Sequence, residues 1–341
     1  MSDLEVSIIV PVYNGGRTIT ALLESLLAQR YARDRFEIIV VDNRSTDMTT
    51  SQVQRFPARL LRENDIQSSY AARNCGVRAA QGALLAFTDA DCVADPDWLS
   101  ELCRPFAQPH VGASVGAILA APATTLVQRF CAQQRWYELA ITQRPFFTPK
   151  TRGERLCRLL PWLDYRSGLS QLPAMANPPT ANVAYRRAIF DQIGFFEPRL
   201  RSGGDLDFAW RMQIETDWQV ALAPQAKIAH QHRNTLRGLL GLYQKNGWGY
   251  AMLAQRYTSS PTRISAQLIV EALTLSGLLV PRQLLRCGAA LVRPASGALE
   301  RAEPALTMLG SLAYQWGKIC GAIEGRWSGA LWKANYRYGT S

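Results

Sequence analysis

Residues 83–92 read ALLAFTDADC, an apolar run that ends in two aspartates, Asp89 and Asp91. Five apolar residues in succession are typical of a buried strand. Two carboxylates at alternate positions beyond its end can hold a hard divalent cation together with a ribose, as a nucleotide-diphosphate site requires. Taken alone, the same motif is more often a strand-end turn capped by aspartate. The rest of the chain must therefore decide between a metal site and a turn.

The sequence on both sides of this run alternates apolar segments with helical patterns from residue 6 to about residue 228. We expect strands at 6–10, 36–41, 59–61, 83–87 and 226–229, and helices at 19–27, 69–80 and 96–102. Asp95 is the predicted N-cap of the last helix, with Pro96 at its first position. Residues 111–128 are uncharged, but Pro122 favours a strand, a loop and a helix start over a membrane span. The alternation predicts an α/β fold with a mostly parallel central sheet flanked by helices.

The composition of the 341 residues, 48% hydrophobic and 19% charged, is close to the globular average and excludes disorder, collagen and coiled coil. The net charge of +11 favours an anionic partner. The seven cysteines form no CxxC pair, which argues against a structural zinc site or a disulfide scaffold and indicates free thiols in the cytosol. The first residues lack the basic segment and long apolar run of a signal peptide, so we expect them to lead directly into a domain.

The βα pattern ends after Thr235. We therefore expect an α/β domain at 1–234, with a basic, aromatic-rich segment at 129–172, and a helical C-terminal region at 235–341. Residues 256–341 hold ten basic and four acidic residues. The apolar stretch at 266–280 contains Glu271 and is followed by Pro281, so we expect it to be too short and too polar to span a membrane.

The helical region also carries the pattern of a basic amphipathic segment. Its apolar and basic positions are Leu268, Leu275, Leu278, Leu279, Arg282, Arg286 and Arg293. Such a segment gains from burial of its leucines and from attraction to anionic headgroups, so we expect it to lie on an anionic membrane surface. The alternative is a pair of helices packed on the α/β domain.

Five ordered segments resemble the inverting family 2 glycosyltransferases of the GT-A fold. They are VSIIVPVYNGGRTITALLESLLAQ at 6–29, EIIVVDNRSTD at 37–47, AARNCGVRAAQGALLAFTDADC at 71–92, ANVAYRRAIFDQIGFFEP at 181–198 and GGDLDFAWRM at 203–212. The resemblance covers residues 6–233, about two thirds of the chain. Several motifs in order are far more specific than any one of them.

The resemblance implies a nucleotide-binding site at the ends of the first strands. Asp42 is expected to bind the base of the donor nucleotide, with an Asx-turn as the alternative. The loop expected to pack on that base consists of Pro11, Val12, Tyr13 and Asn14.

The resemblance also implies a diphosphate and metal site. Asp91 is expected to be the direct ligand of a divalent cation, Mn²⁺ or Mg²⁺, while Asp89 shares its contacts with the ribose. His230 is expected to complete the metal shell, because its spacing to the arginine three residues later resembles a His-x-x-Arg pattern. His232 is the other candidate, and two surface histidines are the alternative to both. Arg73 is expected near the diphosphate, unless it belongs to a solvated helix face.

On the acceptor side, Asp205 aligns with the catalytic base of the family's Gly-Glu-Asp-x-Asp segment. Gly204 departs from that pattern because it replaces the glutamate. A structural N-cap is the alternative role for Asp205. Asn182, Gly204 and Asp207 are assigned to the acceptor side, although Asp207 also suits a cap or an ion pair with Arg211.

The implied activity is inverting transfer of a sugar from a nucleotide-diphosphate donor, with a UDP-sugar favoured, to a saccharide or lipid-linked acceptor in polysaccharide or glycolipid synthesis. The expected location is cytoplasmic and peripheral to the membrane.

A nucleotidyltransferase of related fold is one rival, but its Gly-rich phosphate loop is poorly matched by the Gly-Gly-Arg at 15–17. A catalytically inactive basic protein that binds lipid or nucleic acid is the other. Scattered basic residues without a binding motif argue against nucleic acid.

Overall fold

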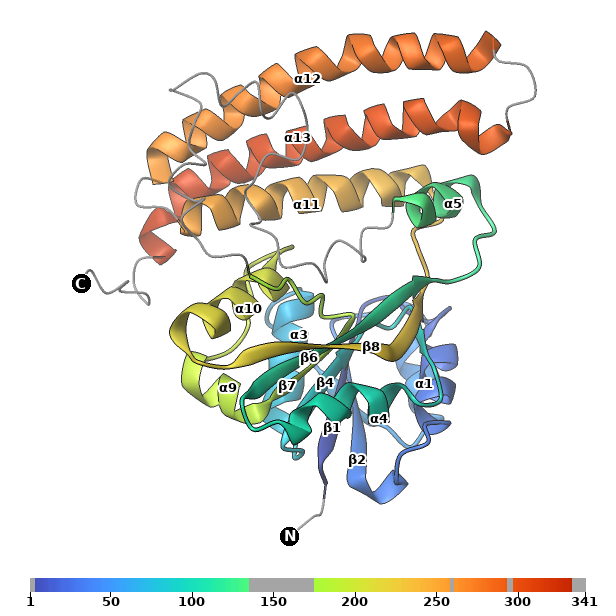
Figure 1. The fold of residues 1–341 in the computed structure, drawn as a ribbon, viewed down its shortest axis with the longest axis vertical. Coiled ribbons are helices and arrows are strands. Elements are labelled where there is room, and N and C mark those ends of the chain that lie inside the picture. The colour runs from blue at the N-terminus through green and yellow to red at the C-terminus, as the bar shows by residue number, and fades with distance from the viewer. Residues whose placement is uncertain (1–3, 135–174, 258–260, 293–296, 333–341) are drawn as a thin grey trace.

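The computed structural model describes residues 4–134, 175–257, 261–292 and 297–332 (Figure 1). Its centre is an eight-stranded sheet in the order β3-β2-β1-β4-β7-β6-β8-β5. The strands are β1 (Val6–Val12), β2 (Phe36–Asp42), β3 (Arg59–Arg62), β4 (Leu84–Thr88), β5 (Cys92–Ala94), β6 (Val111–Ala120), β7 (Asn182–Arg186) and β8 (Gln219–His230). Every strand that the sequence predicts is present. Most of the basic, aromatic-rich segment, residues 135–172, lies outside the described residues.

The first four strands form the parallel half of the sheet. Val12 of β1 pairs with Asp42 of β2, so these two strands end at the same edge. β7 is antiparallel to both of its neighbours, β4 and β6, and β5 is antiparallel to β8. The other strands run in one direction, so the sheet is mixed but mostly parallel, as predicted. The α/β architecture is as predicted, and the edge with the carboxyl ends of β1, β2 and β4 is where ligands bind in such sheets.

Helices cover both faces of the sheet. They are α1 (Ile19–Leu27), α2 (Thr49–Val53), α3 (Ser69–Ala79), α4 (Trp98–Cys103), α9 (Arg187–Ile193) and α10 (Gly204–Glu215). A further helix, α5 (Leu126–Gln133), lies against the C-terminal helices rather than on the sheet (Figure 1). Successive residues of β1 point to opposite faces. Ile9 therefore belongs to the core that contains residues of α3, α9 and α10, whereas Ile8 and Val10 belong to the core that contains residues of α1 and α4.

Helix α4 begins later than the sequence predicts. Its first residue is Trp98 and Asp97 is its N-cap, so the prediction of Asp95 as the cap was wrong. The N–H of Asp95 donates to the carbonyl of Lys227 in β8, which continues the pairing of β5 with β8. This extended pairing holds Asp95 outside the helix, and its carbonyl instead accepts from the N–H of Trp98.

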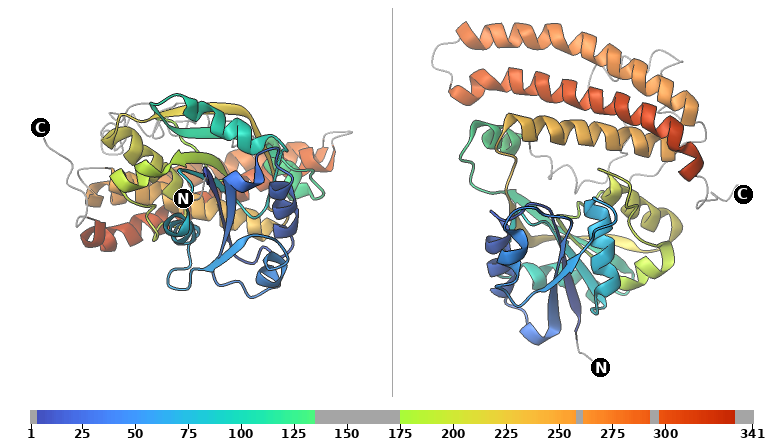
Figure 2. Two further views of the ribbon diagram at one scale, coloured as in Figure 1. Left: turned by 90° about the horizontal axis from the view of Figure 1, so that it is seen from below. Right: turned by 180° about the vertical axis from the view of Figure 1, so that it is seen from behind.

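Three long helices lie over the carboxyl edge of the parallel strands (Figures 1 and 2). They are α11 (Leu236–Arg256), α12 (Pro261–Val292) and α13 (Ala298–Trp332). The first is nearest to the sheet, α13 packs on it, and α12 is outermost (Figure 1). Glycines allow α11 and α13 to approach closely, because a Cβ atom at Gly247 would lie 1.9 Å from the carbonyl oxygen of Tyr314. The predicted change to helices after Thr235 is correct: its side chain caps α11 by accepting from the N–H of Gly238.

The outermost helix differs from the sequence prediction in length. The expectation that residues 266–280 are too short to span a membrane was wrong, because α12 continues through Pro281. Residues Ile264–Ala290, with a mean hydropathy of 1.6, are long and apolar enough to cross a membrane. Length and composition are the only basis of that statement, and a packed helix of a soluble protein meets the same criterion.

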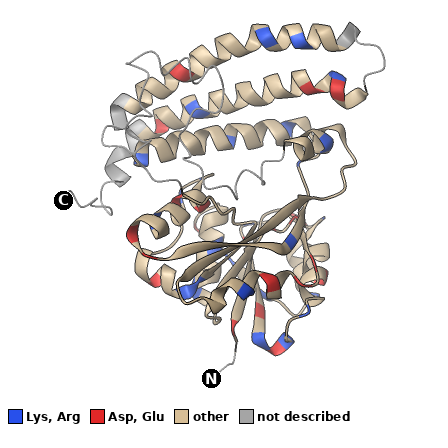
Figure 3. Ribbon diagram, viewed as in Figure 1, with Lys and Arg blue, Asp and Glu red and all other residues tan. Residues whose placement is uncertain are grey.

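The two faces of α12 are distinct. Leu268 is fully buried, so its assignment to an apolar outer surface was wrong. Glu271 is also buried, where it accepts a hydrogen bond from the Lys318 ammonium group of α13. The opposite face exposes four leucines, Leu273, Leu278, Leu284 and Leu285. Few charged residues interrupt this helix (Figure 3), and Arg282 and Arg286 are both exposed.

Candidate active site

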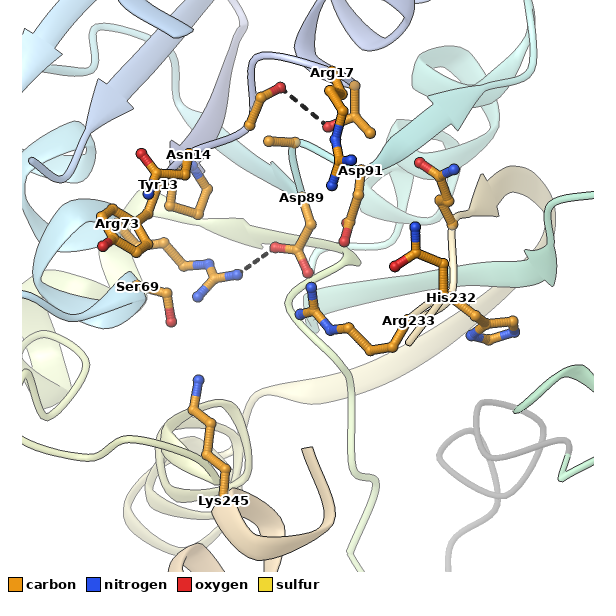
Figure 4. A pocket seen from close by; sticks show the side chains of 16 residues that line it. Tyr13, Asn14, Arg17, Ser69, Arg73, Asp89, Asp91, His232, Arg233 and Lys245 are labelled. Atoms are coloured by element: carbon orange, nitrogen blue, oxygen red, sulfur yellow. Dashed lines mark hydrogen bonds and ion pairs between the residues drawn. The ribbon is translucent and has the colours of Figure 1, made fainter. Parts of the chain in front are cut away.

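A cavity of about 470 Å³ lies between the carboxyl edge of the sheet and helix α11 (Figure 4). Asp89 and Asp91 reach it from the loop after β4, and Tyr13 reaches it from the end of β1. Arg73 extends from α3, and Arg233 from the segment after β8. The cavity therefore collects side chains that are far apart in the sequence.

Asp89, Asp91 and His230 form a cluster whose candidate ligand atoms all lie within 4.8 Å of one another. The pairing of Cys92 in β5 with His230 in β8 brings the histidine to the two aspartates. Its Nε2 atom is 3.4 Å from Oδ1 of Asp91. Two carboxylates and one imidazole are a ligand set that Mn²⁺ accepts, and the carboxylates suit Mg²⁺. The residues that the sequence selected as metal ligands thus fit such an ion.

The electrostatics of the cluster favour a cation. Burial raises the pKa of Asp91, an effect that His230 opposes and Asp89 adds to. A divalent ion would offset both the desolvation and the repulsion between the carboxylates. His232 is a poorer ligand, because its ring points away from the aspartates (Figure 4). Burial, and then the neighbouring His230, lower the pKa of His232 to about 4.

Four cationic side chains of the described residues line the cavity around this cluster: Arg17, Arg73, Arg233 and Lys245 (Figure 4). Arg73 is nearly fully buried, and its guanidinium donates to Oδ1 of Asp89 at 2.5 Å, so it is not on a solvated helix face. Lys245 reaches the cavity from α11. Desolvation by the cavity walls, and then Arg233 and Arg73, lower the pKa of Lys245. The sequence did not predict a role for Lys245, because no motif surrounds it. It indicated Arg233 only through its spacing to His230.

Three of the four residues of the predicted base-binding loop lie at the cavity. Pro11, Tyr13 and Asn14 line the cavity, and the Tyr13 side chain is 54% exposed. Val12 is wrong as a donor contact, because its side chain is buried in the core. Asn14 has a positive φ of 49°, and its side-chain oxygen accepts from the N–H of Thr46.

Asp42, which the sequence assigns to the nucleotide base, is the last residue of β2 and is buried. Its Oδ1 atom accepts from the N–H of Ser45, three residues on, so the carboxylate binds the loop after β2, although not in the two-residue span of an Asx-turn. Among the described residues that line the cavity, its neighbours Tyr13 and Asn14 appear but Asp42 does not. Asp42 therefore lies beside the cavity, and the contact that its carboxylate makes there is with the loop after β2.

Asp205 is the second residue of α10 and is half-buried beside Tyr70, whose hydroxyl donates to Oδ1 at 3.2 Å. Burial raises the pKa of Asp205, while Arg73 opposes that shift. The carboxylate is close enough to Lys245 to influence the pKa of that ammonium group. Asp205 thus lies next to Tyr70 and near two of the cationic side chains, Arg73 and Lys245. Its pKa is raised, which is the direction that a general base needs.

Three acceptor-side assignments were wrong. Asn182 is fully buried, and its amide binds the carbonyls of Ala117 and Ala226 within the sheet. Gly204 is buried against Tyr70, and a Cβ atom at this position would lie 2.8 Å from the tyrosine ring. This close contact explains why no glutamate stands at this position. Asp207 is fully buried as well.

The predicted ion pair of Asp207 with Arg211 is present at 3.1 Å. Asp207 also binds Arg256 at 2.9 Å, and it accepts a hydrogen bond from the Tyr257 hydroxyl at 3.0 Å. Arg256 is the last residue of α11, and Tyr257 follows it. Asp207 therefore joins α10 to the helical region and has no position from which to touch a substrate.

Comparison with known proteins gives a consistent result. A sequence model of the family described as Glycosyl transferase family 2 matches residues 7–194. Glycosyltransferase AglE of Haloferax volcanii is 40% identical over 99 residues, which are 28% of this chain and 33% of AglE. The pre-mycofactocin glycosyltransferase of Mycobacterium tuberculosis is 27% identical over 298 residues, 86% of this chain. The chain spans only 55% of the length of that relative.

Two solved structures share the fold. One is the mannosyltransferase PcManGT from Pyrobaculum calidifontis in complex with GDP-Man and Mn²⁺, with a TM-score of 0.50 and 18% identity over 98% of this chain and 76% of that chain. The other is glucosyl-3-phosphoglycerate synthase from Mycobacterium tuberculosis in complex with Mn²⁺, UDP and phosphoglyceric acid. It has a TM-score of 0.50 and 17% identity over 74% of this chain and 78% of that chain. At these identities the two structures show that the GT-A fold is shared, and nothing about the ligands of this chain.

Proposed function

This chain belongs to glycosyl transferase family 2, and from that premise we propose that it is an inverting glycosyltransferase. It transfers a sugar from a nucleotide-diphosphate donor to a hydroxyl of a saccharide or of a lipid-linked acceptor. A UDP-sugar is the favoured donor. The product serves polysaccharide or glycolipid synthesis.

One observation carries the proposal. Asp89, Asp91 and His230 come together at the carboxyl edge of the sheet, beside a cavity that four cationic side chains line. A diphosphate carries several negative charges, and its departure becomes easier when fixed positive charges already face it. The combination of a cation site with surrounding arginine and lysine suits that leaving group.

The mechanism assigns separate roles to the two ends of the site. Mn²⁺ or Mg²⁺, when bound by Asp89, Asp91 and His230, supplies Lewis-acid stabilisation of the leaving diphosphate. Arg73 is held in place by its ion pair with Asp89, so its charge is oriented before the donor arrives. Tyr13 offers an exposed aromatic face to the nucleotide base.

Asp205 acts as the general base. It accepts the proton of the acceptor hydroxyl while that oxygen attacks the anomeric carbon from the face opposite the diphosphate. The bond to the diphosphate oxygen breaks as the new glycosidic bond forms, so the anomeric configuration inverts. No covalent enzyme intermediate forms, and one carboxylate base is sufficient. The raised pKa of Asp205 makes it a better proton acceptor than an exposed aspartate.

The test uses the full chain and a panel of nucleotide sugars. Melting temperature is measured with each nucleotide sugar, with Mn²⁺ and with EDTA, because a ligand that binds only the folded state raises apparent stability. The donor that stabilises the chain is then followed for metal-dependent release of nucleoside diphosphate. A nucleotidyltransferase would instead release pyrophosphate from a nucleoside triphosphate and a sugar phosphate. A protein that only binds would release neither product, and either result would overturn the proposal.

We further propose that the chain is cytoplasmic and lies on the inner membrane surface through α12. The exposed leucines on the outer face of this helix provide an apolar surface, with Arg282 and Arg286 beside them. Burial of such leucines in the headgroup region adds to the attraction between arginine and anionic lipid. Arg293, which the sequence includes in this segment, lies outside the described residues.

A further inference from the structure

A second cavity, of about 790 Å³, adjoins the first. It lies between the loop that precedes α3, the segment before α10, and helices α11 and α13. Four residues line both cavities: Tyr13, Ser69, Arg233 and Lys245. The two cavities therefore meet at Lys245 and Arg233, which are labelled in Figure 4. A volume of this size is sufficient for a small saccharide.

The second cavity is cationic. Its charged lining consists of Arg199, Arg201, Arg233 and Lys245, and none of the described residues that line it is acidic. Arg201 is held by Glu324 at 3.3 Å and lies over the Trp248 ring. In the described part of the chain, the other three cations form no ion pair. All four cationic side chains are exposed to solvent. A cavity lined by charges of one sign attracts a ligand group of the opposite sign, so this lining suits an anion.

The donor accounts for only part of this charge. Arg233 and Lys245 also line the first cavity, where the diphosphate of a nucleotide sugar would bind. Arg199 lines the second cavity alone. It is exposed, its backbone N–H donates to the Glu197 carboxylate, and its guanidinium group forms no hydrogen bond or ion pair with the described residues. Arg199 is therefore available to a second anion, distinct from the donor diphosphate.

The position of this cavity relative to the base identifies the second anion. The Ser68 hydroxyl, on the cavity wall, donates to the carbonyl of Leu200, and Tyr70, two residues further along the chain, binds Asp205. The polar lining also includes Gln67 and Gln244, whose exposed amide groups can bind sugar hydroxyls. Asp205 is not among the described residues that line either cavity, but Tyr70 holds it behind the wall that Ser68 belongs to. The second cavity is therefore on the side of the site where the acceptor is expected.

We propose that the second cavity binds the acceptor, and that this acceptor carries a phosphate group held by Arg199 and Lys245. The inference rests on the proposed function, because it takes Asp205 as the base that faces the acceptor. The phosphate belongs either to a soluble sugar phosphate or to a lipid-linked saccharide. Both present the same charged group to the same two side chains.

The experiment measures binding by calorimetry to the full chain saturated with UDP and Mn²⁺, so that the diphosphate site is filled. The probes are glucose 1-phosphate and the neutral methyl glucoside. We expect glucose 1-phosphate to bind at least tenfold more tightly. Arg199→Gln should weaken it about 10- to 150-fold, the range for a hydrogen bond to a charged group. Arg55→Gln is the matched control, because Arg55 is exposed and lines neither cavity.

The source of the phosphate is separated by a second arm. Phosphatidylcholine vesicles with and without polyprenyl phosphate replace the soluble probes. A preference for the loaded vesicles that Arg199→Gln removes assigns the phosphate to a lipid, whereas binding of glucose 1-phosphate alone assigns it to a soluble acceptor. If neither phosphate probe is preferred over its neutral counterpart, or if the arginine variant binds as the wild type does, the inference is wrong.

Failure of the proposed function has a different signature. In that case UDP and Mn²⁺ do not stabilise the wild-type chain at all. The phosphate titration is then repeated without nucleotide, and the comparison of Arg199→Gln with Arg55→Gln still decides the inference, because Arg199 lines only the second cavity.

Discussion

Replacing Asp205 with asparagine separates catalysis from structure. Asparagine retains the shape of the side chain and can still accept the hydrogen bond from the Tyr70 hydroxyl, but it cannot take a proton from an acceptor hydroxyl. General bases contribute about 10² to 10⁴ in rate, so transfer should fall by roughly that factor. This corresponds to about 3–5 kcal/mol in the activation barrier. Donor affinity should remain, because Asp205 does not line the donor cavity.

The pH dependence follows from the direction of the pKa shift. Burial raises the pKa of Asp205 in the folded chain, so transfer by the wild type should decline on the acid side at a pH above that expected for an exposed aspartate. The variant should lack this limb. A group with a raised folded-state pKa stabilises the fold at acid pH and loses that contribution as the pH rises through the folded value. At neutral pH the ionised carboxylate is therefore unfavourable, and Asp205→Asn should unfold at an equal or higher temperature.

Asp207→Asn is the matched control, because it makes the same change two residues away. Asp207 is fully buried between Arg211 and Arg256, and Arg211 is only 3% exposed. Removal of one charge from such a buried network costs about 3–5 kcal/mol of stability. This variant should therefore unfold at a clearly lower temperature, whereas Asp205→Asn should not.

The assays are turnover, donor affinity and thermal unfolding on the same preparations. The reasoning is refuted if Asp205→Asn transfers sugar at a rate near that of the wild type. It is also refuted if Asp207→Asn, at a temperature where it remains folded, loses more turnover than Asp205→Asn.

The remaining predictions concern the metal and the membrane. Asp91→Ala should abolish Mn²⁺-dependent binding of UDP in calorimetry, and Asp89→Ala should weaken it less; full binding by the Asp91 variant would contradict the assignment. His230→Ala should weaken the same binding, while His232→Ala should leave it within about threefold, because only the first joins the aspartate cluster. In flotation with anionic vesicles the wild type should bind in a salt-dependent way, and Leu285→Glu should reduce the bound fraction, since Leu285 is 76% exposed on α12. Binding that is indifferent to lipid charge would reject the membrane proposal.

The sequence predicts those parts of the fold and site that depend on local pattern. Asp89 and Asp91 could be located because a short apolar run precedes them, and parallel strands bring their carboxyl ends to one edge. The sequence could not show in the same way that the Val12 side chain is buried in the core while Tyr13 is exposed. β1 is buried on both faces, so its sequence is apolar apart from Ser7 and shows no alternation that would reveal the inward side chain.

Long-range packing decides what the sequence could not predict. Pro281 should end a helix at a cost of about 3 kcal/mol, but α12 continues because it packs along α13. Glu271 appeared too polar for an apolar helix, and Lys318 of α13 is the partner that makes its burial possible. Lys245 belongs to the same class, since only the docking of α11 on the sheet places its ammonium group in the cavity.

That docking also links the base to the cation site. Asp205 and Asp207 occupy the first turn of one helix, α10. Asp207 is bound by Arg256 and Tyr257, at the end of α11, and Lys245 lies on α11 itself. Any shift of α11 relative to the sheet therefore moves Lys245 and disturbs the contact that holds the helix of the base. The helical region is for this reason a physical part of the active site, whichever surface its outer helix contacts.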